Sequence, residues 1–236
     1  MRASNNCSKQ SFMPSARTDA TRERLLNAAA ELFAERGFRG ATMRAIAARA
    51  GTNLAAANYH FGSKEKLYRE VAFSLFAALE ERLDRAGLRP DPETFARLPR
   101  AVLEDLLRSR IRAILENLLD EPGLHGTLIV RELCDPTPAL RQMVRRFIAP
   151  MHGEMEALVR ALAPGLSHED AQRCVRGIAG QVFFYRTHRP ALLLLDGRRV
   201  YPPRFCEEVA RHIADFSLGG IAALAARPEA RCDAAS

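Results

Sequence analysis

The chain has 236 residues, of which 47% are hydrophobic and 27% charged, a composition typical of a globular protein. This length allows one large domain or two small ones, with a sizeable buried core. No apolar run approaches the ~18 residues that a membrane span requires, and residues 1–16 lack the apolar centre of a secretory signal. We therefore expect a cytoplasmic protein with no membrane partner.

The five cysteines, at positions 7, 134, 174, 206 and 232, are odd in number and far apart. Disulfide frameworks and zinc sites both need clustered or short-range ligands. His168 and Cys174 are six residues apart, as are Cys206 and His212, and that spacing puts two side chains on different faces of a helix. We expect reduced cysteines, no metal and no cofactor.

The positive charge is concentrated at the start of the chain. Residues 1–70 hold 12 Lys and Arg against 6 Asp and Glu, whereas residues 71–236 hold 23 against 22. A small basic unit ahead of a nearly neutral remainder suggests an anionic partner, such as nucleic acid, for the first part only. The alternative is an ordinary solvated helical surface rich in arginine.

The first elements are a tail and a helix. Residues 1–17 are polar and without periodicity, which indicates a flexible tail. An apolar helical face then runs from Leu25 to Phe33, with Thr18 or Asp19 as its N-cap, and Gly37 ends the helix.

Three further helices have well-marked ends. Thr42 is placed to cap a short second helix that stops at Gly51, and Asn53 caps a third over residues 54–60 that closes at Gly62. Ser63 begins a fourth helix that runs to about residue 85. The second and third helices have the spacing of a helix-turn-helix. We assign residues 18–65 to a helix-turn-helix domain that continues into a linking helix to about residue 85.

A Pro-marked loop over residues 89–92 separates this unit from the rest. No later segment alternates with period two for long enough to be a strand. We expect an all-α protein, with a helical domain over residues 95–227 and a frayed tail over 228–236. Apolar stripes predict the helices of that domain at residues 103–118, 124–133, 140–162, 168–187 and 203–225.

The stretch from Thr42 to Leu67 resembles the N-terminal DNA-binding domain of the TetR family of bacterial transcriptional regulators. In that family a Thr opens the second helix, "IA…AG" leads into the turn, and "Y-x-F-G-S-K-E-x-L" follows. Here residues 59–67 read YHFGSKEKL. The resemblance covers about residues 18–80, and it implies a three-helix DNA-binding domain with a double-stranded DNA operator as its partner.

Two kinds of DNA contact are expected from this stretch. Three consecutive alanines let the third helix approach base edges closely, where the Asn58 amide can pair with adenine and Arg44 is the other polar reader. By resemblance, Tyr59, His60 and Lys64 contact phosphates, joined by the Thr42 hydroxyl. Each residue taken alone has an ordinary alternative, such as a core position for Tyr59. The predicted DNA-binding set is Thr42, Arg44, Asn53, Leu54, Ala55, Ala56, Asn58, Tyr59, His60 and Lys64.

The resemblance also implies a helical ligand-binding and dimerisation domain in the second part. GQVFFYRTHRP at residues 180–190 and AANYHFGSKEKLY at residues 56–68 look like the CecR-type subgroup of the family. We expect the helices at 168–187 and 203–225 to form the homodimer face, although the same stripes also suit an intramolecular core.

Methionines and aromatic residues offer adaptable apolar walls for a small-molecule effector, although such stripes are more often simply core. The predicted effector pocket consists of Met143, Phe147, Met151, Met155, Gln181, Phe184 and Tyr185. Phe183 is a further wall, and the polar neighbours are His125, Arg131, His152, Arg186 and His188.

No nucleophile elbow, phosphate loop, dinucleotide fingerprint or zinc-protease motif occurs, so we do not expect an enzyme. We expect a ligand-released repressor that acts as a homodimer on a near-palindromic operator. A helical protein-interaction adaptor is an alternative that does not explain the basic first part. A non-specific DNA-binding protein is another, and it would lack sequence discrimination.

Overall fold

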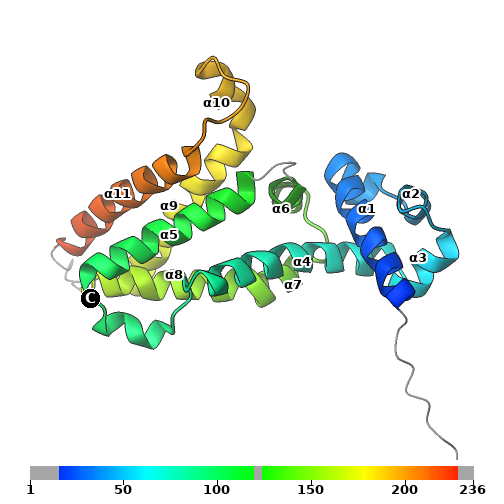
Figure 1. Cartoon of the computed structure of the whole chain (residues 1–236). Coiled ribbons are helices and arrows are strands. Elements are labelled where there is room, and N and C mark those ends of the chain that lie inside the picture. Colours follow the sequence, from blue (N-terminus) through cyan, green and yellow to red (C-terminus); the bar gives the residue numbers. More distant parts are fainter. Residues whose placement is uncertain (1–15, 120–123, 228–236) are drawn as a thin grey trace, which may run out of the picture. The chain divides into compact units, whose positions relative to one another are not determined.

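The computed structural model describes residues 16–119 and 124–227 (Figure 1). Every regular element within these ranges is a helix, which confirms the all-α prediction. The predicted tails, residues 1–17 and 228–236, lie almost entirely outside the described residues. The chain divides into two compact units, Met1–Val71 and Ala72–Ser236, and the division falls inside the helix expected to link them.

Helix α1, Ala16–Gly40, opens the first unit and is interrupted where the sequence predicts its end. Gly37 has φ 70°, a left-handed conformation that glycine adopts without steric cost. The predicted N-caps are wrong, because the helix begins at Ala16 and both Thr18 and Asp19 lie inside it. Asp19 still suits its place, since a negative charge in the first turn complements the helix dipole.

Helices α2, Met43–Arg49, and α3, Leu54–Phe61, begin at the predicted caps. The Thr42 Oγ1 atom accepts a hydrogen bond from the Ala45 amide at 3.1 Å, and the Asn53 Oδ1 atom accepts one from the Ala56 amide at 2.8 Å. Each bond satisfies an amide that the first turn of a helix otherwise leaves unpaired. Gly62, with φ 73°, closes α3 as predicted, and α4 follows over Lys64–Arg85.

The core of the first unit joins these helices. Phe33 of α1 packs edge-on against Tyr68 of α4, with ring centroids 4.9 Å apart. Ile46 of α2 and Ala57 of α3 are fully buried, so the helix-turn-helix is held by its inner face. The opposite face of α3 is left open to solvent.

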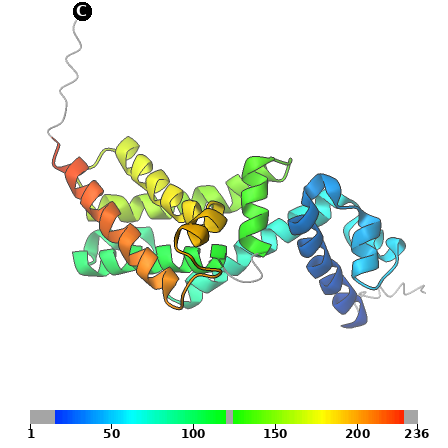
Figure 2. The same cartoon turned by 90° about the horizontal axis from the view of Figure 1, so that it is seen from above.

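The second unit is a helical bundle. Helices α5 (Arg100–Leu119), α8 (Ala149–Leu162), α9 (His168–Thr187) and α11 (Phe205–Ala225) lie side by side in both views (Figures 1 and 2). Helix α6, Leu124–Cys134, packs against α5. None of the helices in the described ranges is long and apolar enough to cross a membrane.

The predicted single helix over residues 140–162 is wrong in one respect. The structure has α7, Leu140–Met143, then a π-helical turn η2, Val144–Ile148, and only then α8. Pro150, in the first turn of α8, has no amide hydrogen and its ring crowds the carbonyl four residues earlier. A wider π turn ahead of it relieves that conflict.

Two short helices were not predicted. The Pro-marked loop continues into a 3₁₀ turn, η1, over Pro92–Arg97, which the Asp91 side chain caps. The apolar run ending at Leu195 forms α10, Arg189–Leu195, between α9 and α11. Both begin near a proline, which fits the first turn of a helix.

Candidate DNA-binding surface and ligand cavity

The outward face of α3 combines a polar residue, an aromatic residue and small residues. Asn58 is exposed and the Tyr59 side chain is 73% exposed, so the alternative that Tyr59 belongs to the core is wrong. Ala55 is exposed and Leu54 is 36% exposed at the start of the same helix. Ala56 and His60 are half-buried and flank this face.

Thr42 and Asn53 are the N-caps of α2 and α3. Their side-chain oxygens accept the capping hydrogen bonds of α2 and α3. The Thr42 hydroxyl hydrogen and the Asn53 amide hydrogens remain able to donate. Both groups therefore combine a structural role with the capacity to bind a phosphate.

The two arginines of α2 differ in their hydrogen-bonding partners. Arg49 forms a double hydrogen bond with Glu35, at 2.5 and 3.0 Å, and these bonds hold the pKa of the Glu35 carboxyl below its usual range. Arg44 is exposed, and no partner for it occurs among the described residues. Of the two, Arg44 has a guanidinium group left for an external anion or base.

Lys64 lies in the first turn of α4, but its side chain is half-buried. Its Nζ atom donates to the Ala41 carbonyl at 3.2 Å and stands 4.5 Å from the centroid of the Phe38 ring. This contact joins α4 to the end of α1 and provides a structural reason for the lysine. Because an ammonium group has three hydrogens, two remain for a phosphate.

Lys66 is exposed two residues further on, and sequence reasoning did not single it out. Its Nζ atom lies near Gly62, at 3.7 Å from where a Cβ atom would be at that position. The repeated Lys in "SKEK" was the available signal for a second cation beside the turn.

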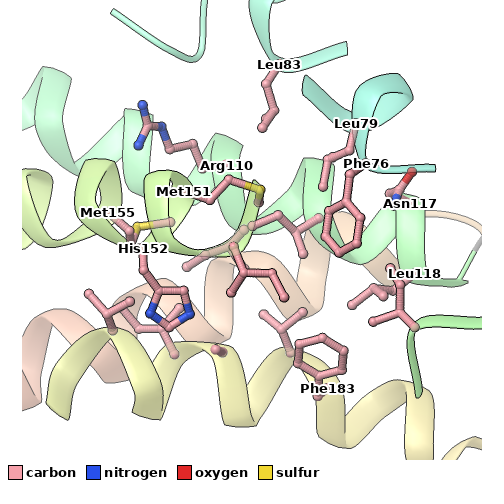
Figure 3. Close-up of a pocket in the computed structure, with 18 of the residues that line it drawn as sticks. Phe76, Leu79, Leu83, Arg110, Asn117, Leu118, Met151, His152, Met155 and Phe183 are labelled. Atoms are coloured by element: carbon pink, nitrogen blue, oxygen red, sulfur yellow. The ribbon is translucent and has the colours of Figure 1, made fainter. Parts of the chain in front are cut away.

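A cavity of about 260 Å³ lies within the second unit (Figure 3). Side chains of α4 to α9 line it, and most of them are apolar. Phe76, Leu79 and Leu83 come from the later turns of α4, and Phe183 comes from α9. The apolar lining is that of a site for a small organic molecule, and the volume lies just below the usual range of about 300–1,000 Å³.

The structure brings three of the seven predicted pocket residues to this cavity, namely Met143, Met151 and Met155. Phe147 lies outside its lining and stacks on Phe76 at 5.2 Å between ring centroids. Gln181 is bonded to Ser217 of α11, at 3.3 Å.

The expectation that Phe184 and Tyr185 line the pocket does not hold for this cavity. Phe184 is 45% exposed and stacks on His188, and Tyr185 packs edge-on against Phe205. Successive residues of a helix point about 100° apart, so when Phe183 faces inward its two neighbours turn away.

Of the predicted polar neighbours, only His152 lines the cavity. Arg131 is exposed, and Arg186 donates a hydrogen bond to Thr127. His188 faces Phe184, and the His125 side chain lies outside what the structure describes.

Three buried polar residues of the lining were missed. Arg110 is 3% exposed, Asn117 is 7% exposed and Glu132 is 1% exposed. The signal was present in α5, because Arg110 and Asn117 continue the spacing of Leu107 and Ile114 on one helical face. Polar residues at core positions are the informative ones.

The charged side chains of the lining have ionic or hydrogen-bonding partners within the chain, although one nitrogen of Arg110 lacks a hydrogen bond. The Arg89 Nη2 atom lies 2.7 Å from a Glu154 oxygen, and Arg110 donates to the Leu88 carbonyl at 2.6 Å. The Arg110 Nη2 atom has no hydrogen bond but stands 3.6 Å from Glu154 Oε2. Glu132 accepts hydrogen bonds from the amide and hydroxyl of Thr137, each at 2.9 Å.

His152 differs from these charged groups. Burial, and then the positive charge of Arg176, lowers the pKa of His152 below its usual value, so the imidazole is neutral near pH 7. No group of His, Cys, Asp and Glu within residues 16–119 and 124–227 is arranged to hold a metal ion.

The chain is similar to known regulators in both parts. Residues 25–71 match the bacterial regulatory proteins of the tetR family, and residues 103–221 match the C-terminal domain of the HTH-type transcriptional dual regulator CecR. The CecR protein of Shigella flexneri is 29% identical over 189 residues, which cover 76% of this chain and 81% of the relative.

Two further proteins extend the comparison. The HTH-type transcriptional repressor NicS of Pseudomonas putida is 28% identical over 180 residues, 74% of this chain and 79% of NicS. The crystal structure of AibR in complex with isovaleryl coenzyme A and operator DNA superposes with a TM-score of 0.59 at 20% identity. That superposition covers 85% of this chain and 97% of AibR, and it shows a shared fold. The chain belongs to the TetR family of bacterial transcriptional regulators and has the C-terminal domain of the CecR type.

Proposed function

We propose that this protein is a repressor that binds a near-palindromic operator as a homodimer and releases it when a small molecule occupies the cavity. The exposed face of α3 is the observation that carries the proposal, because it presents Asn58 and Tyr59 on a capped helix. Membership of a family of DNA-binding regulators supports it. A bacterial repressor acts on cytoplasmic DNA, so we place the protein there and assign it no catalytic role.

In this proposal Asn58 and Arg44 read bases, and Ala55 and Ala56 let α3 lie close to the base edges. Asn pairs with adenine through two hydrogen bonds, which neither alanine nor leucine can form. Leu54 adds apolar contact at the start of the helix. Contacts to the phosphate backbone of the DNA set the position of the helix in the groove. They are made by Tyr59, His60, Lys64, the Thr42 hydroxyl and the Asn53 amide.

The dimer is proposed to form through exposed stripes of α9 and α11. On α9 the stripe is Gly177, Gly180 and Phe184, and on α11 it includes Phe216, 68% exposed, and Gly219. A Cβ atom added at any of these glycines would meet nothing within 4 Å. Glycine inside a helix costs about 1 kcal/mol relative to alanine, and no packing within the chain requires it there. Small residues along both stripes allow a second copy to approach closely.

A dimer also fits the geometry of the DNA duplex. Two recognition helices about 34–36 Å apart read successive major grooves on one side of the duplex. That arrangement calls for a near-palindromic operator, because each protomer presents the same residues to its half-site.

Effector release is proposed to pass through α4. This helix runs from Lys64 in the first unit to Leu83 at the cavity wall, so both units share it. A ligand shifts the protein toward release only if it binds the releasing conformation more tightly. AibR, a protein of the same fold, was crystallised with both isovaleryl coenzyme A and operator DNA.

Fluorescence anisotropy on duplex DNA tests the proposal. The full chain is titrated into labelled duplex from the region upstream of its own gene, beside a scrambled duplex, at about 0.15 M salt, where non-specific binding is weak. We expect a preference of ~10³-fold or more for an operator duplex. If the upstream duplex shows none, selection from a random pool decides whether an operator exists.

The two other readings predict different results. A non-specific DNA-binding protein binds all duplexes about equally, and random selection enriches no sequence. A helical adaptor binds no duplex at all. Either result would overturn the proposed repressor.

A further inference from the structure

Asn117 is a polar residue of the cavity wall whose side chain bonds to none of the described residues. Its side chain, on α5, is 7% exposed and lines the cavity (Figure 3). No hydrogen bond to it occurs within the described part of the chain. An amide group carries two donor hydrogens and an acceptor oxygen, and at the cavity wall these are open to a molecule inside the cavity. Since no described residue bonds to the Asn117 amide, its place at the cavity wall points to a hydrogen-bonding group on a ligand.

His152 provides a second polar group at the cavity. It lies on α8, and Figure 3 shows it on the opposite side of the cavity from Asn117. No residue of the described ranges is hydrogen-bonded to its ring. A neutral imidazole provides one donor and one acceptor, and it adds no charge to the site.

The charged side chains of the lining provide no unpaired charge that would favour a charged ligand. Arg110 and Glu154 lie 3.6 Å apart, Arg89 binds Glu154, and Glu132 is bonded to Thr137. A charge brought among them would lose its water without gaining an unpaired counter-charge. Glu154 also opposes the approach of an anion to Arg110.

The size of the cavity limits the ligand. An apolar cavity of ~150 Å³ holds benzene, so 260 Å³ accommodates roughly ten to fifteen non-hydrogen atoms. Met151 and Met155 in the wall adapt to different outlines without a polar cost.

We infer that the effector is an uncharged, mostly apolar molecule with a hydrogen-bonding group at each end, one bound by Asn117 and the other by His152. This inference rests on the proposed function only in treating the cavity as the effector site.

Four probes with ten non-hydrogen atoms each test the inference: 1,8-octanediol, 1-nonanol, octanoate and nonylammonium. Dissociation constants are obtained for the full chain from the dependence of the unfolding midpoint on probe concentration. We expect the two neutral probes to bind at least tenfold more tightly than either charged probe. Tighter binding of octanoate than of the neutral probes would assign the site to an anion held by Arg110 and overturn the inference. Failure of both neutral probes to bind would also overturn it.

Two variants identify the polar contacts. Asn117→Leu and His152→Leu are each expected to weaken the diol about fivefold relative to nonanol, because the diol alone can use both ends of the site. Met155→Leu, a lining change without a polar group, is the control and should leave the ratio between the two probes unchanged. An unchanged ratio in both polar variants would overturn the assignment of the contacts.

DNA binding is measured separately with the same probes. If the diol binds and depends on Asn117 while the affinity for operator stays constant, the ligand class is correct and effector release is wrong. If only octanoate lowers the affinity for operator, the proposed effector release is correct and the proposed ligand class is wrong.

Discussion

We expect the Asn117 amide to lower the stability of the ligand-free protein, and its replacement tests this directly. Leucine has nearly the same shape and no polar atoms, so we expect Asn117→Leu to raise the free energy of unfolding by about 1 kcal/mol or more. Chemical denaturation of the two proteins measures it. Asn27→Leu, at an exposed position of α1, is the matched control, since it shares the gain in helix propensity without the buried amide. An equal effect of the two substitutions would show that the Asn117 amide costs nothing.

Substitutions of Asn58 and Lys64 test the proposed division between reading of bases and binding of the DNA backbone. Asn58→Ala is expected to cost ~1–3 kcal/mol of operator affinity and to relax the preference at one base pair. Lys64→Met should weaken all sequences alike and reduce the slope of log affinity against log salt by about one. It should also lower the stability of the first unit, because the bond to Ala41 is lost. Anisotropy on single-base operator variants measures both effects. An unchanged preference in Asn58→Ala would remove Asn58 as the reader.

His152 makes stability depend on pH in a known direction. Because burial lowers its pKa in the folded protein, the unfolded chain takes up the proton first as the pH falls below about 6.5. The folded state therefore loses stability between that pH and the lower folded pKa. We expect the unfolding free energy of the wild type to fall relative to His152→Gln between pH 7.5 and 5.5. Parallel curves for the two proteins would show that His152 is not the group responsible.

At the scale of helices, the sequence predicts the elements with side-chain caps most accurately. Thr42 and Asn53 cap α2 and α3, and Gly62 ends α3 as expected. These signals are local, because the side chain bonds to an amide only three residues away. The apolar stripes of α5, α9 and α11 were also clear, since each spans several turns.

The missed features depend on geometry that a sequence pattern does not record. The π turn before Pro150 keeps the apolar residues on roughly one face, so the pattern over residues 140–162 reads as a single helix. The cavity depends on how each helix is rotated, which decides that Phe183 faces inward while Phe184 and Tyr185 do not. The buried position of Asn117 could have been predicted from the sequence, because Asn117 interrupts an apolar stripe.

The contact between α5 and α6 depends on one glycine. A Cβ atom at Gly126 would collide with the Leu118 carbonyl of α5 and with the Arg186 side chain. Backbone atoms cannot give way cheaply, so we expect Gly126→Ala to lower the free energy of unfolding by about 1–3 kcal/mol. Thermal or chemical denaturation checks this. Gly165→Ala, where an added Cβ meets nothing, serves as the control. Equal stabilities of the two variants would mean that α6 does not pack closely on α5.

At the scale of the whole molecule, charge and cavity are divided between the two units. The excess of positive charge belongs to residues 1–70, whereas the cavity is built from residues 76–183. The proposed DNA binding and the proposed binding of a small apolar molecule would therefore be carried out by different parts of the chain. In the proposed homodimer the two tasks would be coupled further, because one dimer would present two basic units to the same duplex.

The glycines of α9 and α11 test that association. Gly219→Leu places a large side chain where the proposed partner helix approaches, and we expect the dissociation constant of the dimer to rise about tenfold or more. Sedimentation velocity over a range of concentrations measures the shift from dimer to monomer.

Gly153→Leu is the matched control, because Gly153 is an equally exposed glycine within α8, where an added Cβ also meets nothing. In a monomeric protein both substitutions would stabilise their helices by about 0.5–1 kcal/mol and change nothing else. Only an interface makes the two positions differ. If Gly219→Leu and Gly153→Leu sediment alike at every concentration, the stripes of α9 and α11 are not the dimer face. The operator would then have to be read by a differently arranged pair of chains, or by one chain alone.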